Sequence, residues 1–572
     1  MKYHFSVSNP AERFVDITLT LETKSQRQLD LKLPVWRPGR YEEGNFAKNI
    51  RRFSVVNSKG EPLSFQKVSK SVWRIFAKEK DSQITVKYQY YANRLDAGSC
   101  YVDDRQLYIN PIHCCFYTDE LRNEKCMVEL DVPFAEIATS LKQSGKRKFE
   151  ADNFDDLVDS PFIAGSQLQH YSYTVAGTLF HIWIEGDYFP EQNKIVNDFT
   201  AFTKTQFKMM QTFPFGEYHF LIQAVPHTFY HGVEHLKSTV IVIGPSSGLH
   251  KRELYNELIG VSSHELFHAW NIKTIRPVEM QPYNYDGENY SPSGFVYEGA
   301  TTYYGDLFLF RCKYFSEEEY FNELNFRINK HLSGEGRFNY SVAESSFDTW
   351  LDGYVPGVPG RKTSIYDEGC LITWMLDFLI RKYSGNKKSI DDVFRILYND
   401  FGKKGRGYTA EDYRQVAEQC AGKSLETFFT EIVFRAVSYQ SMLEQVMEFA
   451  GLELEEQTST KRCERDFGIR LDESGNIAVV AAVASDAPAI SALSVGDELV
   501  AVNGHKADKR VHDLFEQFSN EDQIEVTVFS QLRLKTVLLK KGNKKYFSGW
   551  KLRNMKSKTA EQELFYKNWS MQ

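Results

Sequence analysis

The stretch Val261-Ser-Ser-His264-Glu265-Leu-Phe-His268-Ala-Trp-Asn-Ile-Lys-Thr274 contains the pattern His-Glu-x-x-His within a segment of helical periodicity. Residues four apart lie on one face of a helix, so the imidazoles of His264 and His268 can bind one metal ion. The carboxylate of Glu265 would then lie beside a water molecule on that metal. The stretch predicts a zinc-dependent hydrolytic site. The alternative is two unrelated histidines on a helix with a glutamate between them.

A catalytic zinc ion needs three protein ligands and one open position. Glu298 lies thirty residues after His268, in the segment Gly294-Phe-Val-Tyr-Glu298-Gly-Ala-Thr-Thr, which begins a second helix of apolar and aromatic residues. We therefore expect Glu298 to complete a His264, His268 and Glu298 set that holds one Zn²⁺ per chain. Glu298 could instead cap the first turn of its helix, where carboxylates are favoured, but the metal would then lack a ligand.

Composition excludes some classes of function. The 572 residues exceed what one hydrophobic core can organise, so several domains are expected. A net charge of −7 without a basic stripe gives no reason to expect nucleic acid. No apolar run approaches the length of a membrane span, and the first residues lack an apolar leader region. We expect no membrane partner, a cytoplasmic location, and reduced thiols for the eight scattered cysteines.

The order of segments predicts a multidomain α+β protein. Residues 1–172 alternate with a period of two, for example over 14–21, 72–76 and 84–91, which indicates a β-sandwich-like N-terminal domain. Residues 173–450 combine strands at 218–225 and 238–244 and a helix at 197–211 with a helix-rich lobe, an order typical of a thermolysin-like catalytic domain. The helices expected in that lobe are residues 251–273, 298–314, 317–332, 369–383, 390–401, 410–420 and 425–436.

The polar stretch 451–461 is expected to be a boundary, and residues 460–545 resemble a PDZ domain. The likeness rests on Ala487-Pro-Ala and on Gly496-Asp-Glu-Leu-Val-Ala-Val-Asn-Gly504. Phe467-Gly-Ile469 stands where backbone amides would take the C-terminal carboxylate of a peptide. The alternative is a PDZ-like fold that only packs against the enzyme. Residues 546–572 are expected to form a charged C-terminal tail.

Two longer patterns point to a family. His-Glu-x-x-His followed by Glu298-Gly-Ala-Thr301 resembles the gluzincin metallopeptidases, and the string from His264 to Pro277 resembles the glycyl aminopeptidase family. Members of that family pair the zinc core with a β-rich N-terminal domain and a C-terminal PDZ domain, so the resemblance covers nearly the whole chain. Phe295 stands where the family often has Trp, and Ala300 where Phe usually follows Glu-Gly. Both are packing positions beside Glu298 and bear on pocket shape rather than on metal binding.

The resemblance implies roles for further residues. Glu265 would be the general base for a zinc-activated water and would return the proton to the leaving amine. The segment Ser364-Ile-Tyr366-Asp-Glu-Gly369 resembles a Tyr-x-x-Gly element whose tyrosine hydroxyl stabilises the oxyanion, which makes Tyr366 the candidate donor. Tyr366 could instead be a core residue at a helix start, and Tyr303 and Tyr304 are rival donors.

An exopeptidase must also recognise a free α-amino group. The stretch His231-Gly232-Val-Glu234-His235 resembles the strand motif that performs this task in gluzincin aminopeptidases. Glu234 would pair with the substrate ammonium, and Gly232 would let the substrate backbone approach an edge strand. The alternative is a turn between two strands.

These expectations favour a zinc aminopeptidase that hydrolyses N-terminal residues from peptides with a free N-terminus. A preference for small residues such as Gly or Ala follows from the family resemblance alone. One alternative is a zinc endopeptidase or oligopeptidase. Another is a non-catalytic peptide-binding protein that uses the PDZ-like domain.

Overall fold

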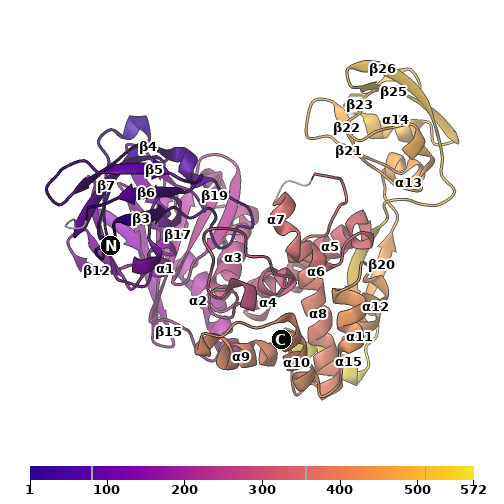
Figure 1. The fold of residues 1–572 in the computed structure, drawn as a ribbon. Coiled ribbons are helices and arrows are strands. Elements are labelled where there is room, and N and C mark those ends of the chain that lie inside the picture. Colours follow the sequence, from indigo (N-terminus) through magenta and orange to yellow (C-terminus); the bar gives the residue numbers. More distant parts are fainter. Residues whose placement is uncertain (79–81, 354–356, 509) are drawn as a thin grey trace. The chain divides into compact units, whose positions relative to one another are not determined.

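The computed structural model describes residues 1–78, 82–353, 357–508 and 510–572 (Figure 1). It divides into two compact units. The first consists of Met1–Tyr320, Glu335–Ser438 and Leu564–Gln572, and the second of Phe321–Gly334 and Tyr439–Glu563. No helix of the described residues is long and apolar enough to cross a membrane.

The N-terminal region is built of three sheets that share one core. Strand β2 shows why the residues fold in this way: Val15, Ile17, Leu19 and Leu21 are buried in alternation with more exposed neighbours, which confirms the predicted strand at 14–21. The largest sheet has the order β12 (Lys142–Gly145), β13 (Lys148–Ala151), β10 (Cys126–Asp131), β1 (Lys2–Ser6), β2 (Phe14–Glu22), β7 (Gln83–Tyr91) and β4 (Ile50–Asn57). The second sheet has the order β11 (Glu136–Thr139), β14 (Phe162–Gly165), β9 (Gln106–Ile109) and β8 (Tyr101–Val102). The third has the order β3 (Gln28–Lys32), β6 (Val72–Phe76) and β5 (Ser64–Lys67).

A five-stranded mixed sheet follows and supports the metal helix. Its order is β15 (Gln169–Val175), β16 (Thr178–Gly186), β17 (Glu217–Ala224), β19 (Ser238–Gly244) and β18 (Phe229–Glu234), with β16, β17 and β19 parallel. Helices α2 (Gln192–Met210) and α3 (Arg252–Phe267) pack beside this sheet (Figure 1). Phe199 of α2 meets Phe220 of β17 with ring centres 4.8 Å apart, so aromatic packing fixes the helices on the sheet.

The helix-rich part continues from a π-helix, η7 (Phe295–Ala300), directly into α4 (Thr301–Arg311). Helix α8 (Ile365–Ser384) crosses η7 at a glycine pair, because a Cβ atom on Gly299 would lie 2.3 Å from the Cα atom of Gly369. Only glycine permits this approach. The remaining α-helices of four or more residues in the described parts of the chain are α1 (Phe154–Val158), α5 (Glu317–Ser333), α6 (Val342–Phe347), α7 (Thr349–Asp352), α9 (Ile390–Asp400), α10 (Ala410–Ala421), α12 (Gln440–Glu448), α13 (Arg462–Phe467), α14 (Val511–Gln517) and α15 (Ala560–Ser570), with a π-turn at Phe429–Val433.

Several predicted boundaries were wrong for local reasons. The helix expected over 251–273 ends at Phe267, because the carbonyl of Asn271 accepts a hydrogen bond from the His268 ring and the next residues form turns. The helix expected from residue 369 begins at Ile365, where the Ser364 hydroxyl accepts from the amide of Asp367 and caps the first turn. The helix expected over 298–314 begins three residues earlier, as the π-helix.

The C-terminal segments also differ from expectation. The supposed boundary 451–461 contains strand β20 (Leu452–Gln457), which pairs with β27 (Gly549–Asn554). Residues 546–572 are therefore not a loose tail. Helix α15 is also packed into the fold, because Trp569 is fully buried and its indole donates to the Tyr303 hydroxyl at 2.9 Å.

Residues 469–540 form a sheet in the order β21 (Ile469–Asp472), β22 (Ala478–Val483), β23 (Glu498–Val502), β25 (Gln523–Ser530) and β26 (Arg533–Lys540), with β24 (His505–Lys506) on β23. Helices α13 and α14 share its apolar core. The amide of Gly468 donates to the Glu464 carbonyl at 3.1 Å and closes α13. The Gly468 amide thus bonds within α13, and binding of a peptide carboxylate by the 467–469 loop stays a prediction.

Candidate active site

Three predicted ligands meet at one point. His264 lies on the last turn of α3, His268 caps that helix, and Glu298 comes from η7. The Nε2 atoms of the two histidines are 3.0 Å apart, and the Glu298 Oε2 atom lies 3.4 Å from His268 Nε2 and 3.8 Å from His264 Nε2. His268 and Glu298 are buried, whereas His264 is partly exposed. The helix spacing and the π-helix together bring this set to one point.

Neighbouring groups orient the ligands for a metal ion. His268 Nδ1 lies 2.6 Å from the Asn271 carbonyl oxygen, which can only accept, so the ring proton is on Nδ1 and the Nε2 lone pair faces His264 and Glu298. The Asn271 side-chain amide donates to the Val296 carbonyl at 2.9 Å and to the Thr301 hydroxyl at 3.0 Å, which ties the end of α3 to η7. The donor set of two imidazoles and one carboxylate fits a catalytic zinc ion.

The site concentrates negative charge in a buried place. Burial lowers the pKa of His268, but Glu298, Glu234 and Glu265 outweigh that effect and raise it to about 9. Burial also raises the pKa of Glu298 and, well above its ordinary value, that of Glu265. A divalent cation would reverse this balance by holding the carboxylates ionised and His268 neutral.

Two further carboxylates face the same space. One carboxylate oxygen of Glu234, one of Glu265 and one ring nitrogen of His268 all lie within 4.8 Å of one another. Glu265 Oε2 and Glu234 Oε1 are buried and make no hydrogen bond. Gly232 on β18 allows this arrangement, because a Cβ atom there would lie 2.3 Å from Glu265 Oε1. The arrangement can accept protons and can hold a cation or an ammonium group.

Tyr366 lies at the start of α8, partly exposed, one turn before Gly369 at the crossing with η7. Its phenol is close enough to Tyr41 to contribute to the raised pKa of that residue, although burial is the main cause. The role of Tyr366 as oxyanion donor stays a prediction.

The sequence reasoning missed a loop of the N-terminal region. The Tyr41 hydroxyl donates to Glu298 Oε1 at 3.0 Å, so a residue 257 positions away supports the third ligand. Gly39 has φ of +81°, and a Cβ atom on it would lie 2.3 Å from Glu234 Oε2. The available signal was the turn sequence Trp36-Arg-Pro-Gly-Arg-Tyr41, in which Pro-Gly is flanked by aromatic and basic side chains.

A second group of possible ligands, His181, Glu217 and His219, fits a metal less well. The two imidazole rings are stacked 4.4 Å apart at 14°, so their lone pairs run parallel instead of converging. The Trp183 indole, which can only donate, lies 3.2 Å from His219 Nδ1. The proton of neutral His219 is therefore on Nε2, the atom that faces Glu217. This tautomer is the opposite of the one at His268.

Known proteins resemble the chain in both its N-terminal and its helix-rich region. The description "Peptidase M61 N-terminal domain" matches residues 2–166 and "M61 glycyl aminopeptidase" matches residues 257–372, which include His264, His268, Glu298 and Tyr366. The crystal structure of an aminopeptidase N family protein from Idiomarina loihiensis is 26% identical, covers 99% of each chain and superposes with a TM-score of 0.91.

An M1 zinc metallopeptidase from Deinococcus radiodurans is 13% identical over 76% of this chain and 93% of its own, with a TM-score of 0.45. No curated protein matches the chain in sequence. The predicted resemblance is confirmed: residues 2–166 and 257–372 match the N-terminal and peptidase domains of the M61 glycyl aminopeptidase family, and the chain is a metallopeptidase.

Proposed function

We propose that the chain is a zinc aminopeptidase that hydrolyses N-terminal residues from peptides. One observation carries the proposal: the buried, unpartnered Oε1 atom of Glu234 belongs to the group of carboxylates that surrounds His268. A buried carboxylate oxygen without a donor calls for a cationic partner, and the ammonium group of a peptide supplies one at a fixed distance from the scissile bond.

The roles of the other residues follow from their positions. One zinc ion per chain, held by His264, His268 and Glu298, would polarise the scissile carbonyl and activate a water molecule. Glu265 presents an unpartnered Oε2 atom, takes a proton from the attacking water and passes it to the leaving amine. Tyr366 donates a hydrogen bond to the oxyanion.

Substrate position follows from β18. Glu234 fixes the ammonium group, and the missing Cβ atom of Gly232 leaves the space that the Glu265 carboxylate occupies beside the strand. This pairing of an amine anchor with a general base favours exopeptidase action over endopeptidase or oligopeptidase action. The two unpartnered carboxylates beside the histidines likewise favour catalysis over a purely peptide-binding role. Release of small residues such as Gly or Ala is proposed from the description of the matched peptidase domain.

The test separates metal binding from chemistry. Glu265→Gln should retain one zinc per chain by elemental analysis and lose hydrolysis of aminoacyl amides by at least about 10²-fold. N-acetylation of a peptide should abolish its cleavage by the zinc-loaded wild type, because Glu234 then faces no ammonium. Turnover of Glu265→Gln at the wild-type rate, or equal cleavage of acetylated and free peptides, would overturn the proposal.

The fold assignments beyond the matched segments belong to the same proposal. We assign residues 173–450 to a thermolysin-like catalytic domain and residues 460–545 to a PDZ-like domain. Strand β21 forms one edge of the C-terminal sheet, where a peptide strand can add. Capture of a peptide C-terminus there is tested by titrating the full-length Glu265→Gln protein with peptides whose C-terminus is free or amidated. The cytoplasm stays the predicted compartment.

A further inference from the structure

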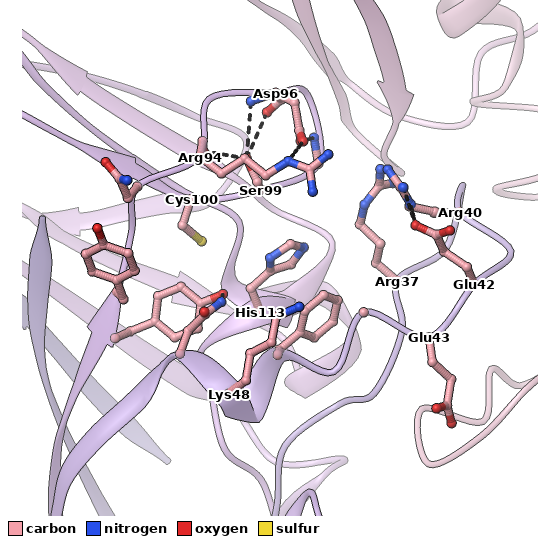
Figure 2. A pocket seen from close by; sticks show the side chains of 17 residues that line it. Arg37, Arg40, Glu42, Glu43, Lys48, Arg94, Asp96, Ser99, Cys100 and His113 are labelled. Carbon is pink, nitrogen blue, oxygen red and sulfur yellow. Dashed lines mark hydrogen bonds and ion pairs between the residues drawn. The ribbon is translucent and has the colours of Figure 1, made fainter. Parts of the chain in front are cut away.

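A pocket of about 390 Å³ lies beside the loop that contacts the catalytic carboxylates. Its lining includes Arg37, Arg94, Asp96, Gly98 and His113 (Figure 2). The pocket is therefore built from the N-terminal region, and none of the proposed catalytic residues lines it.

Arg37 is the unusual group in this pocket. It is 3% exposed, its Nη1 atom donates to the Pro38 carbonyl at 3.3 Å, and its Nη2 atom is buried without an acceptor. The guanidinium lies against the backbone, because a Cβ atom on Gly98 would be 2.0 Å from Nη2. A guanidinium stays charged in proteins, and a buried charge without a partner is costly.

The neighbouring carboxylates are engaged elsewhere. Asp96 pairs with Arg94 at 2.5 Å and Glu42 pairs with Arg40, and Figure 2 draws interactions for these pairs and none for Arg37. Among the residues that the structure describes, no carboxylate lies within ion-pair distance of Arg37. Burial raises the pKa of Asp96, but the charges of Arg37 and Arg94 outweigh that effect and lower it, so Asp96 partly balances Arg37 from beyond ion-pair distance. The buried Nη2 atom of Arg37 still has no acceptor among the described residues.

His113 adds a second polar atom. It is 7% exposed, its ring is stacked on Phe46 with centres 3.9 Å apart, and its Nε2 atom is buried without a partner. Burial, assisted by the charge of Arg37, lowers the pKa of His113 to about 3, so the ring is neutral. Arg37 and neutral His113 together suit an anionic ligand.

The pocket is close to the reacting groups. Arg37 is two residues from Gly39, which touches Glu234, and consecutive residues span at most about 3.5 Å each. The backbone of Arg37 therefore lies within about 7 Å of Gly39, the residue that touches Glu234.

We propose that this pocket is a carboxylate subsite in which Arg37 binds a carboxylate of the peptide substrate and determines specificity. The inference rests on the proposed aminopeptidase function and deepens it. The favoured substrates are dipeptides, through their C-terminal carboxylate, or peptides with an acidic side chain at the second position.

The first experiment compares kcat/KM of the zinc-loaded full-length protein for Gly-Phe, Gly-Phe-amide and Gly-Asp-amide. We expect at least one of the two carboxylate peptides to be cleaved ~10-fold or more better than Gly-Phe-amide, since a hydrogen bond to a charged group contributes about 1.5–3 kcal/mol. Preference for Gly-Phe identifies the C-terminal carboxylate, and preference for Gly-Asp-amide identifies the side chain. Equal cleavage of all three overturns the proposal, and this arm needs no variant.

The second experiment uses Arg37→Gln, with Arg37→Lys as the conservative variant. Arg37→Gln should lower kcat/KM for the preferred carboxylate peptide by ~10- to 100-fold and for Gly-Phe-amide by less than ~3-fold, and Arg37→Lys should restore part of the difference. Arg51→Gln, which removes an arginine that pairs with Glu12 outside the pocket, is the matched control and should change neither. Equal losses on both substrates would make Arg37 merely structural.

A binding measurement separates this inference from the proposed function. Zinc-loaded Glu265→Gln should bind the preferred carboxylate peptide at least ~10-fold more tightly than Gly-Phe-amide in calorimetric titration, and the double variant with Arg37→Gln should lose that difference. If no peptide is hydrolysed but the difference is found, the aminopeptidase proposal fails and the subsite stands. If peptides are hydrolysed without any difference in binding or rate, the subsite fails alone.

Discussion

The Nδ1 atom of His268 donates to the carbonyl oxygen of Asn271 at 2.6 Å, and this bond decides which ring nitrogen is available to a metal ion. The bond requires the chain to leave the helix immediately after His268, which is why α3 ends there. The Asn271 side chain then holds the turn against η7, the element that carries Glu298. The hydrogen bond that orients His268 for a metal ion therefore also accompanies the end of α3.

Asn271→Ala tests this coupling. The variant keeps the backbone carbonyl but loses the amide that donates to Val296 and Thr301, so the turn and η7 are held together less firmly. Zinc affinity should fall by about 10- to 100-fold, the usual cost of losing a group that supports a ligand. Competition with a chromogenic chelator measures this change. Asn399→Ala, which removes an asparagine from the surface of α9, is the control, and equal affinities for the two variants would contradict the prediction.

Gly39 provides a test of the loop from the N-terminal region. An added Cβ atom would lie 2.3 Å from Glu234 Oε2, so Gly39→Ala should displace that carboxylate and lower kcat/KM for a free aminoacyl amide by ~10-fold or more, while zinc is retained.

Gly60 offers a matched control for backbone strain. Its φ of +80° is nearly that of Gly39 at +81°, but nothing lies within 4 Å of its added Cβ atom. Gly60→Ala should carry the same conformational cost and leave activity unchanged. If both variants lost activity alike, backbone strain and not contact with Glu234 would be responsible.

The sequence was informative where function depends on local spacing. His264 and His268 are four residues apart on one helix, so their meeting follows from helix geometry, and Glu298 follows from the need for a third ligand. Tyr41 and Gly39 were not predictable in this way. Their contacts with Glu298 and Glu234 depend on how the N-terminal region packs against the catalytic sheet, which no local pattern encodes.

The same distinction explains the errors at the ends of elements. A helical period cannot show that the Asn271 carbonyl accepts a hydrogen bond from an imidazole, so the predicted helix ends six residues later than the observed one. The segment after residue 546 is charged, and its partners lie far away in sequence: Trp569 donates to Tyr303, and β27 pairs with β20. Composition alone therefore suggested a tail.

Asp159 should be a large contributor to stability. It is nearly buried, accepts from Lys273 Nζ at 2.8 Å, from the Leu236 amide at 2.9 Å, and lies 3.1 Å from His235 Nδ1. The Lys273 side chain is fully buried, so Asp159→Asn leaves a buried ammonium without its counter-ion. We expect a loss of about 3 kcal/mol in the free energy of unfolding, seen as a lower urea midpoint.

An exposed ion pair supplies the control for Asp159. Asp400→Asn breaks an i,i+4 pair with Lys404 in which both side chains are more than half exposed, and it should lower the free energy of unfolding by at most about 0.5 kcal/mol.

Protonation of Asp159 at low pH should destabilise the fold, as the Asp159→Asn variant does. Burial opposes ionisation, but Lys273 and His235 hold its folded pKa below the unfolded value, so its contribution is present above about pH 4 and is lost as pH falls through the folded pKa. A variant as stable as the wild type would refute this role.

His219 should make stability depend on pH in a higher range. Burial is the main cause that lowers its pKa to about 3, and the neighbouring His181 and His170 add to the effect, whereas Glu217 lies 4.0 Å away. Between about pH 3 and pH 6.5 the unfolded chain binds a proton that folded His219 does not, so stability falls as pH is lowered from about 7. The slope for this residue is about 1.4 kcal/mol per pH unit.

The variant His219→Gln can still accept the Trp183 hydrogen bond but cannot be protonated, so its urea midpoint should change less between pH 7 and pH 5 than that of the wild type. His250→Gln, at an exposed histidine, should keep the wild-type slope. Tryptophan fluorescence follows unfolding in both cases. Because burial in this sheet keeps the folded ring neutral, equal slopes for wild type and His219→Gln would mean that protonation of His219 is not coupled to unfolding.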